Sequence, residues 1–223
     1  MIKPNMATML GYVATDAKVE SELLQALLSK SADQSFNRIT VDSDTSTNDS
    51  CMLVATGASG VLVSEDDQAL LSAFTEVLDR VMRDLAHAIV RDGEGATKFV
   101  TVAVDSAAHQ REALTVAYDI AHSPLVKTAL FASDPNWGRI LAVVGRAEVE
   151  NLDLDALQIY LGDVCIVENG GRAASYTEEA GQAVMDQEEI TIRVVLNRGD
   201  VSETVWTTDL SHDYVSINAD YRS

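Results

Sequence analysis

Residues 64–104 read SEDDQALLSAFTEVLDRVMRDLAHAIVRDGEGATKFVTVAV, and this stretch sets the class of fold. Its first part predicts a long helix over 65–91, with Ser64 as the N-cap and carboxylates in the first turn, where the helix dipole favours them. The apolar residues recur at three- and four-residue spacing and form one stripe: Leu70, Leu71, Phe74, Val77, Leu78, Val81, Leu85 and Ile89. Gly93 and Gly95 end this helix, and the β-branched run at 99–104 predicts a strand.

The rest of the chain continues the alternation of helices and strands. Three more helices are predicted, over 19–30, 110–121 and 126–131. Further strand-like segments occupy 9–14, 51–56, 140–144, 189–196 and 201–207, and the turn at 197–200 predicts that the last two form a hairpin. We therefore expect an α+β fold, a layered α/β sandwich whose mixed or antiparallel sheets are covered by helices around one continuous core.

Composition excludes several classes of protein. With 223 residues, 47% of them hydrophobic and 23% charged, the chain is typical of folded globular proteins. The formal net charge of −19 disfavours binding to nucleic acids and to anionic membranes. No apolar run approaches the roughly 20 residues that span a bilayer, and Lys3, Pro4 and Asn5 do not resemble a signal peptide. Two cysteines, Cys51 and Cys165, cannot build a disulfide framework, so we expect a cytoplasmic protein.

Most familiar sites of chemistry have no counterpart in the sequence. The four histidines, His87, His109, His122 and His212, stand in no HxH or HExxH spacing, so no metal site is expected. Neither a Walker A motif nor GxGxxG nor GxSxG occurs. The stretch NGGR at 169–172 predicts a tight turn more strongly than a phosphate-binding loop.

The opening, residues 1–10, reads MIKPNMATML and carries a candidate nucleophile. Self-cleaving precursors use a small residue followed by Thr and an apolar strand. In the N-to-O acyl shift the hydroxyl of Thr8 attacks the carbonyl of Ala7, and hydrolysis of the resulting ester frees the α-amine of Thr8. With a reference pKa of about 7.7–8.0, this amine can act as the base for its own hydroxyl. The alternative is that Ala-Thr occurs here by chance.

Two further patches are candidates for a site. In DGEGATK, residues 92–98, glycines flank Glu94, which allows close approach of a ligand to the backbone. The alternative for this patch is a helix C-cap with an incidental acid. The final stretch, 209–223, reads DLSHDYVSINADYRS. Because apolar residues occur close to its end, we expect this segment to dock onto the body of the protein; these residues are Leu210, Tyr214, Val215 and Ile217.

Together these patches resemble the ornithine acetyltransferase family, the bifunctional glutamate N-acetyltransferases of arginine biosynthesis. The matching stretches are MIKPNMATML at 1–10, TSTNDS at 45–50, DGEGATK at 92–98, DPNWGRI at 134–140, and the final 15 residues. The resemblance implies a fold like that of the N-terminal-nucleophile enzymes. It also implies a precursor that cuts itself at Ala7–Thr8, so that 1–7 is a remnant and 8–223 is a single catalytic domain, the β chain.

The same resemblance implies an enzyme and assigns roles to residues. Thr8 would take the acetyl group from N2-acetylornithine, and glutamate would accept it, without a dissociable cofactor; some family members also use acetyl-CoA as a donor. Glu94 would contact substrate and assist proton movement, while Asn218 and Ser223 would line the site. The family commonly has Thr where this chain has Ser223. The implied partner is the α chain of the same precursor, in a heterotetramer of two α and two β chains.

Two other functions remain open from the sequence. The family's α half supplies a Thr-Gly oxyanion hole that these residues lack, so the chain could be an inactive fragment or a subunit that requires a partner. An exposed apolar surface would support that hypothesis. The other alternative is an amidase or aminopeptidase of similar architecture, in which water replaces glutamate as the acceptor.

Overall fold

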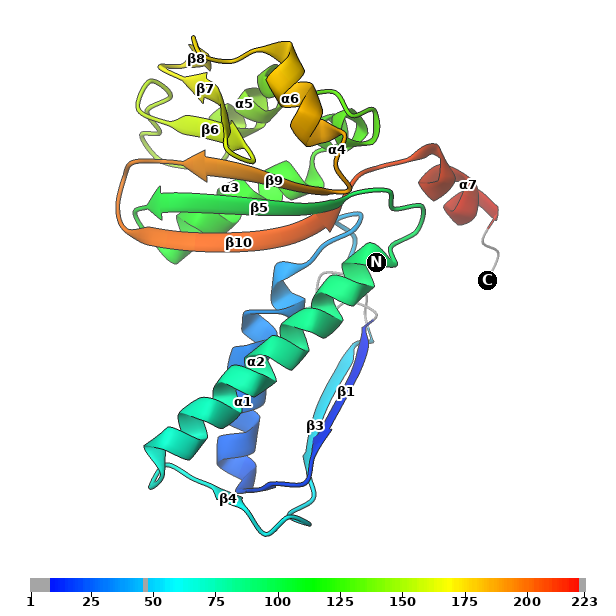
Figure 1. Ribbon diagram of the computed structural model, residues 1–223, viewed down its shortest axis with the longest axis vertical. Helices are drawn as coiled ribbons and strands as arrows, with labels where there is room; N and C mark the ends of the chain where they lie inside the picture. The colour runs from blue at the N-terminus through cyan, green and yellow to red at the C-terminus, as the bar shows by residue number, and fades with distance from the viewer. Residues whose placement is uncertain (1–8, 46–47, 221–223) are drawn as a thin grey trace. The chain divides into compact units, whose positions relative to one another are not determined.

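The computed structural model describes residues 9–45 and 48–220, and Figure 1 shows the order of their elements. Contacts divide the chain into two compact units, residues 1–89 and 90–223, which are described separately. Within the described ranges, no helix is long and apolar enough to cross a membrane. The expected division into a remnant over 1–7 and one domain over 8–223 stays a prediction.

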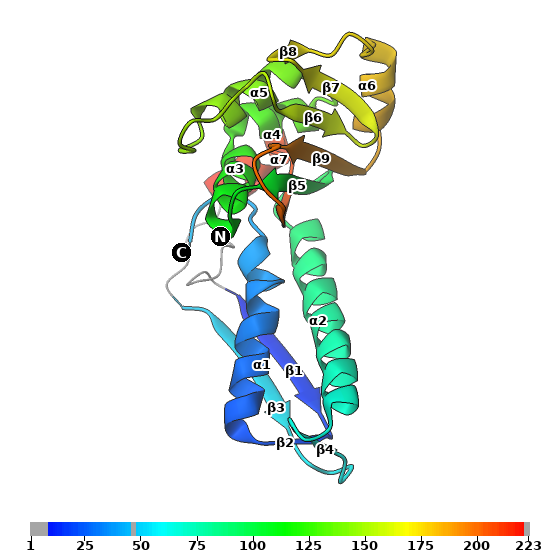
Figure 2. The same cartoon turned by 90° about the vertical axis from the view of Figure 1, so that its left-hand side faces the viewer.

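The first unit packs helices against short parallel strand pairs (Figure 2). Its elements are β1 (Leu10–Thr15), β2 (Lys18–Val19), α1 (Ser21–Asp33), η1 (Phe36–Arg38), β3 (Ser50–Ala55), β4 (Leu62–Val63) and most of α2 (Gln68–Arg91). Strand β1 pairs in parallel with β3, so that Leu10 lies opposite Ser50, and β2 pairs in parallel with β4. The strands predicted at 9–14 and 51–56 and the helix predicted at 19–30 are thus confirmed, with bounds that differ by one to three residues.

Helix α2 is confirmed, but its start and its buried face differ from the prediction. It begins at Gln68, and the cap is Asp67 instead of Ser64, because Leu70 N donates a 3.0 Å hydrogen bond to Asp67 Oδ1. Four residues in one i, i+4 row are buried: Leu78, Met82, Ala86 and Val90. Three members of the predicted stripe are instead exposed: Val77, Val81 and Leu85. The described chain therefore covers only part of the apolar face of α2, and the part with Val77, Val81 and Leu85 stays exposed.

The second unit is built on a six-stranded mixed sheet with the order β10-β5-β9-β6-β7-β8. The strands are β5 (Phe99–Ala107), β6 (Gln158–Leu161), β7 (Val164–Glu168), β8 (Gly171–Arg172), β9 (Glu189–Val195) and β10 (Val201–Thr208). Only β5 and β9 run parallel, and every other neighbouring pair is antiparallel. The helices are α3 (Gln110–His122), α4 (Pro124–Phe131), α5 (Trp137–Arg146), α6 (Glu178–Met185) and α7 (His212–Asp220).

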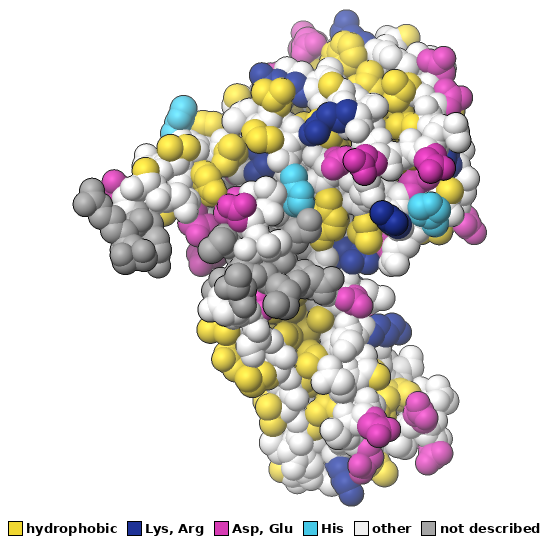
Figure 3. All heavy atoms as spheres, turned by 180° about the vertical axis from the view of Figure 1, so that it is seen from behind, with side chains coloured by type: hydrophobic (Ala, Val, Ile, Leu, Met, Phe, Trp, Pro, Cys, Tyr) yellow, Lys and Arg dark blue, Asp and Glu magenta, His cyan; other side chains and the backbone are white. Residues whose placement is uncertain are grey.

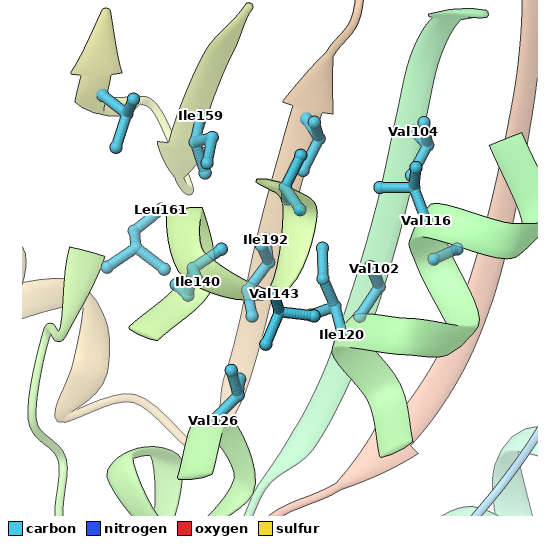
Figure 4. Close-up of a cluster of buried hydrophobic side chains, with 14 of the residues drawn as sticks. Val102, Val104, Val116, Ile120, Val126, Ile140, Val143, Ile159, Leu161 and Ile192 are labelled. Atoms are coloured by element: carbon cyan, nitrogen blue, oxygen red, sulfur yellow. The ribbon is translucent and has the colours of Figure 1, made fainter. Parts of the chain in front are cut away.

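Helices α3, α4 and α5 cover one face of this sheet and form an apolar core with it (Figure 4). Residues from every one of these layers meet there, among them Val102, Val104, Val116, Ile120, Val126, Ile140, Val143, Ile159, Leu161 and Ile192. The helices predicted at 110–121 and 126–131 are confirmed as α3 and α4. A mixed sheet covered by helices confirms the expected α+β layered fold.

The strand predicted at 140–144 is wrong, because these residues lie in α5. Asn136 caps this helix by accepting a 3.1 Å hydrogen bond from Arg139 N. The buried residues Ile140, Val143 and Val144 follow helical i, i+3, i+4 spacing. The periodicity of a short apolar run cannot by itself distinguish a strand from a buried helix, and the cap at Asn136 is the local signal for the helix here.

The predicted hairpin of 189–196 and 201–207 is also wrong, although both strands exist. Strand β5 lies between β9 and β10, so the turn at 197–200 passes over the end of β5. Arg198 N and Gly199 N both donate to Ser106 O, at 2.7 and 2.9 Å. A Cβ added at Gly199 would lie 2.4 Å from Ala107 O, so the close crossing requires glycine.

Candidate functional site

Glu94 lies in a tight turn between the end of α2 and the start of β5. The turn is closed by backbone bonds from Gly93 N to Val90 O at 3.2 Å and from Ala96 N to Gly93 O at 3.0 Å. Gly95 has φ +66°, in the left-handed region that favours glycine. Glu94 itself is exposed, so its carboxylate is accessible to a ligand.

The C-terminal segment meets this turn at Gly95. Ser211 Oγ donates a 2.7 Å hydrogen bond to Gly95 O and accepts one of 3.2 Å from Tyr214 N, which makes Ser211 the N-cap of α7. A Cβ added at Gly95 would lie 2.6 Å from both Ser211 Oγ and Tyr214 N. The structure therefore brings together two of the patches that the sequence marked separately, and the contact depends on the absence of a side chain at Gly95.

A buried carboxylate, Asp209, holds the other end of the same turn. Its Oδ1 accepts hydrogen bonds from Thr97 N at 2.8 Å and Lys98 N at 2.9 Å, and its Oδ2 accepts one from Thr97 Oγ1 at 2.7 Å. Lys98 Nζ donates to Met185 O at 2.8 Å and Gln187 O at 2.9 Å. Asp209 was not among the predicted site residues, although it is the first residue of the C-terminal stretch that matches the family.

Lys127 of α4 supports this segment from the side of the core. Its ammonium group is buried and donates to Thr207 Oγ1 at 2.9 Å and to Thr208 O, while its backbone oxygen accepts from Leu210 N at 3.1 Å. A buried charge is tolerated only when hydrogen bonds replace its water, so these contacts fix the path of the chain from β10 into the tail.

Beyond Ser211 the tail is less attached than expected. Helix α7 has no buried residues, and Val215 and Ile217 are 61% and 46% exposed. The segment therefore docks through residues 209–214, as expected, but Val215 and Ile217 take no part in this attachment. Asn218, a predicted substrate-binding residue, is exposed on α7 and donates a 2.9 Å hydrogen bond to Tyr214 O.

Three predicted site residues, Ala7, Thr8 and Ser223, lie outside the described residues. The structure does describe Met9, whose N–H donates to Asp49 Oδ1 and whose carbonyl accepts a 2.8 Å hydrogen bond from Ser50 N. Asp49 and Ser50, the last two residues of the TSTNDS stretch, therefore contact the residue that follows Thr8. Asp49 was not among the predicted site residues, and its position in a motif that matches the family is the signal in the sequence that points to it.

The two cysteine thiols and the metal-binding side-chain types were further candidates for chemistry in the described chain. Burial raises the pKa of the Cys51 thiol, and burial together with the charge of Glu168 raises that of Cys165, so neither is an activated thiolate at neutral pH. Within 9–45 and 48–220, no three His, Cys, Asp or Glu side chains are grouped to hold a metal ion. The turn predicted at 169–172 is confirmed: Asn169 and Gly170 have φ of 50° and 71°, and Glu168 pairs with Gly171 across it.

Comparisons with known proteins agree with these features. The ArgJ family model matches residues 1–223. The chain is 61% identical over 224 residues to the arginine biosynthesis bifunctional protein ArgJ of Pseudomonas fluorescens and 60% identical over 228 residues to that of Psychrobacter arcticus. Each match covers 100% of this chain and 55% of the relative, so the chain spans about half the length of these curated relatives.

A solved structure shares the fold. The crystal structure of the arginine biosynthesis bifunctional protein ArgJ from Bacillus halodurans superimposes with a TM-score of 0.89 at 38% sequence identity, over 96% of this chain and 100% of that chain. The fold and the motifs thus place the protein in one class, the α+β layered proteins that resemble ornithine acetyltransferases. The chain belongs to the ArgJ family.

Proposed function

We propose that this chain is the β portion of a glutamate N-acetyltransferase of arginine biosynthesis. The observation that carries the proposal is the meeting of the Glu94 turn with the C-terminal segment through Asp209 and Ser211, in a chain of the ArgJ family. Its relatives are named arginine biosynthesis bifunctional proteins. A cytoplasmic location, expected from the small number of cysteines, is part of the same proposal.

In the proposed maturation step, Thr8 Oγ attacks the carbonyl carbon of Ala7 and the Ala7–Thr8 C–N bond breaks. Water then hydrolyses the ester, which leaves a carboxylate on Ala7 and a free α-amine on Thr8. The surroundings of Met9, the residue that follows Thr8, support Thr8 as the nucleophile. Met9 bonds to Asp49 and Ser50 at the start of the parallel β1–β3 pair, so the chain is held in place next to Thr8.

In the proposed transfer, Thr8 Oγ attacks the acetyl carbonyl of N2-acetylornithine, and the C–N bond to ornithine breaks as the leaving amine gains a proton. The amine of glutamate then attacks the acetyl ester, which regenerates the Thr8 hydroxyl. Glu94 contacts substrate and assists these proton movements, and Asn218 and Ser223 bind polar groups of the amino acids. No dissociable cofactor is required, and acetyl-CoA is a further acetyl donor in the proposal.

The partner in this proposal is the α chain of the same precursor, in a heterotetramer of two α and two β chains. An uncovered apolar sheet face supports it: Leu10, Tyr12, Met52 and Val54 are 49–64% exposed on one face of β1 and β3. Figure 3 shows hydrophobic side chains on the surface of the first unit, residues 1–89, which contains β1 and β3. Parallel sheets are normally covered on both faces, so this face fits a surface that another chain covers.

The same surface favours the second candidate, a subunit that is inactive until its partner binds. The experiment compares the isolated chain with the complex formed with the rest of the precursor. Intact mass shows whether a species beginning at Thr8 forms, and product analysis follows acetylornithine with and without glutamate. N-acetylglutamate formed only in the complex supports the transferase with a required partner, whereas free acetate formed regardless of glutamate indicates the amidase alternative.

Removal of residues 218–223 is expected to raise the KM for both acetylornithine and glutamate in the complex. The last part of α7 has no buried residue, so the melting temperature should fall by only a few degrees. Both quantities are measured on the same samples, with Val215→Ser as a control that changes an exposed apolar residue of α7 but keeps Asn218. Unaltered kinetics would remove Asn218 and Ser223 from the site, and a collapse of the melting temperature would give the tail a structural role instead.

A further inference from the structure

Asp209 lies in the connection between β10 and α7, and its side chain bonds to a turn that is distant in the sequence. The residue is 3% exposed, and its two carboxylate oxygens accept three hydrogen bonds at 2.7–2.9 Å from Thr97 and Lys98. Hydrogen bonds to an ionised acceptor are stronger than those between neutral groups. Asp209 is therefore a strong and specific attachment for two consecutive residues of the glycine turn.

The turn is attached to the C-terminal segment at two points. Ser211 Oγ bonds to Gly95 O, and Asp209 accepts from Thr97 and Lys98, so residues 209–211 supply both attachments. Glu94 immediately precedes the first attached residue. The backbone position of Glu94 must follow that of 209–211, which the buried ammonium group of Lys127 holds through Thr207 and Thr208.

We propose that Asp209 is a positioning residue for acetyl transfer, acting through Glu94. Its carboxylate keeps the 94–98 turn in the geometry from which Glu94 reaches the substrate, and it fixes that turn to the segment that leads into α7 and Asn218. The proposal rests on the proposed function, since it requires Glu94 to take part in the reaction. Displacement of a reacting group by about 1 Å can lower a rate roughly a hundredfold, so a small shift of this turn is measurable.

The test uses variants in the complex with the rest of the precursor. Asp209→Ala removes both acceptor oxygens, and with them all three hydrogen bonds, and is expected to lower kcat about ten- to a hundredfold. Asp209→Asn keeps one oxygen for the two backbone N–H groups and can donate to Thr97 Oγ1, so it should recover most of the lost activity. Val205→Ala is the matched control, because it removes buried apolar contacts of β10 and leaves the hydrogen bonds of Asp209 to the turn unchanged. It should lower the melting temperature and leave kcat unchanged below that temperature.

A double-mutant cycle with Glu94→Gln separates positioning from other roles. If Asp209 acts through Glu94, adding Asp209→Ala to Glu94→Gln should reduce kcat by less than threefold further. Multiplicative losses, or full activity of Asp209→Ala, would overturn the proposal. Hydrogen exchange gives a readout besides activity: the Thr97 and Lys98 amides should exchange at least tenfold faster in Asp209→Ala, and equal rates would overturn it as well.

Failure of the proposed function has a different signature. If the unmodified complex transfers no acetyl group from acetylornithine to glutamate, the proposed function is wrong, and the positioning role falls with it even where exchange shows an intact turn. If the complex is active and Glu94→Gln is fully active, the transferase stands while the role of Asp209 through Glu94 is overturned.

Discussion

Thr8→Ala is expected to abolish both self-cleavage and acetyl transfer in the complex with the rest of the precursor. Alanine has no hydroxyl to attack the Ala7 carbonyl, so the precursor should keep its full intact mass. Without cleavage there is no free α-amine at this position to act as a base, and without Oγ there is no atom to carry the acetyl group. Cleavage is followed by mass spectrometry and transfer by the formation of N-acetylglutamate.

Thr8→Ser is the control for this experiment. It keeps a hydroxyl and can still generate an α-amine, so we expect partial cleavage and partial activity. Acetyl transfer by Thr8→Ala at a rate close to that of the unmodified protein would exclude Thr8 from the mechanism. Cleavage without transfer in Thr8→Ser would separate the two reactions and show that transfer depends on the Thr8 side chain beyond its hydroxyl.

Glu94→Gln is expected to lower turnover by about a hundred- to ten-thousandfold, the usual range for loss of a general acid or base. The change should leave folding nearly intact, because Glu94 is exposed and the turn around it is closed by backbone bonds of Gly93 and Ala96. Turnover is measured at saturating acetylornithine and glutamate, and the melting temperature is measured on the same preparation.

Asp92→Asn is the matched control for Glu94→Gln, since Asp92 is an exposed carboxylate in the same turn. It should leave turnover unchanged, which would show that a nearby negative charge alone is not what the reaction uses. Unchanged turnover in Glu94→Gln would support the alternative that Glu94 is an incidental acid at the end of α2.

Helix α5 and the β9–β10 turn show where prediction from local sequence fails. Residues 140–144, ILAVV, are apolar and mostly β-branched, yet they are helical, with the cap at Asn136 and with Ile140, Val143 and Val144 buried. The turn at 197–200 has the composition of a hairpin, yet it crosses β5. Strand β5, with Val100, Val102 and Val104 fully buried, pairs with β9 on one side and β10 on the other, an order that the turn residues alone do not specify.

The sequence by itself determined the features that depend on near neighbours along the chain: the long helix α2, its glycine end, the exposed Glu94 turn, the tight turn at 169–172 and the matching motifs of the family. Only the tertiary structure decided that the Glu94 turn and the tail meet, across a separation of 112 residues between Thr97 and Asp209. Helix periods, caps and turn residues act over a few positions, so they can be read locally. A buried carboxylate is stable only where hydrogen bonds replace the water that it loses on burial. Asp209 therefore bonds to the backbone N–H groups of Thr97 and Lys98, which lie beside it only in the folded chain.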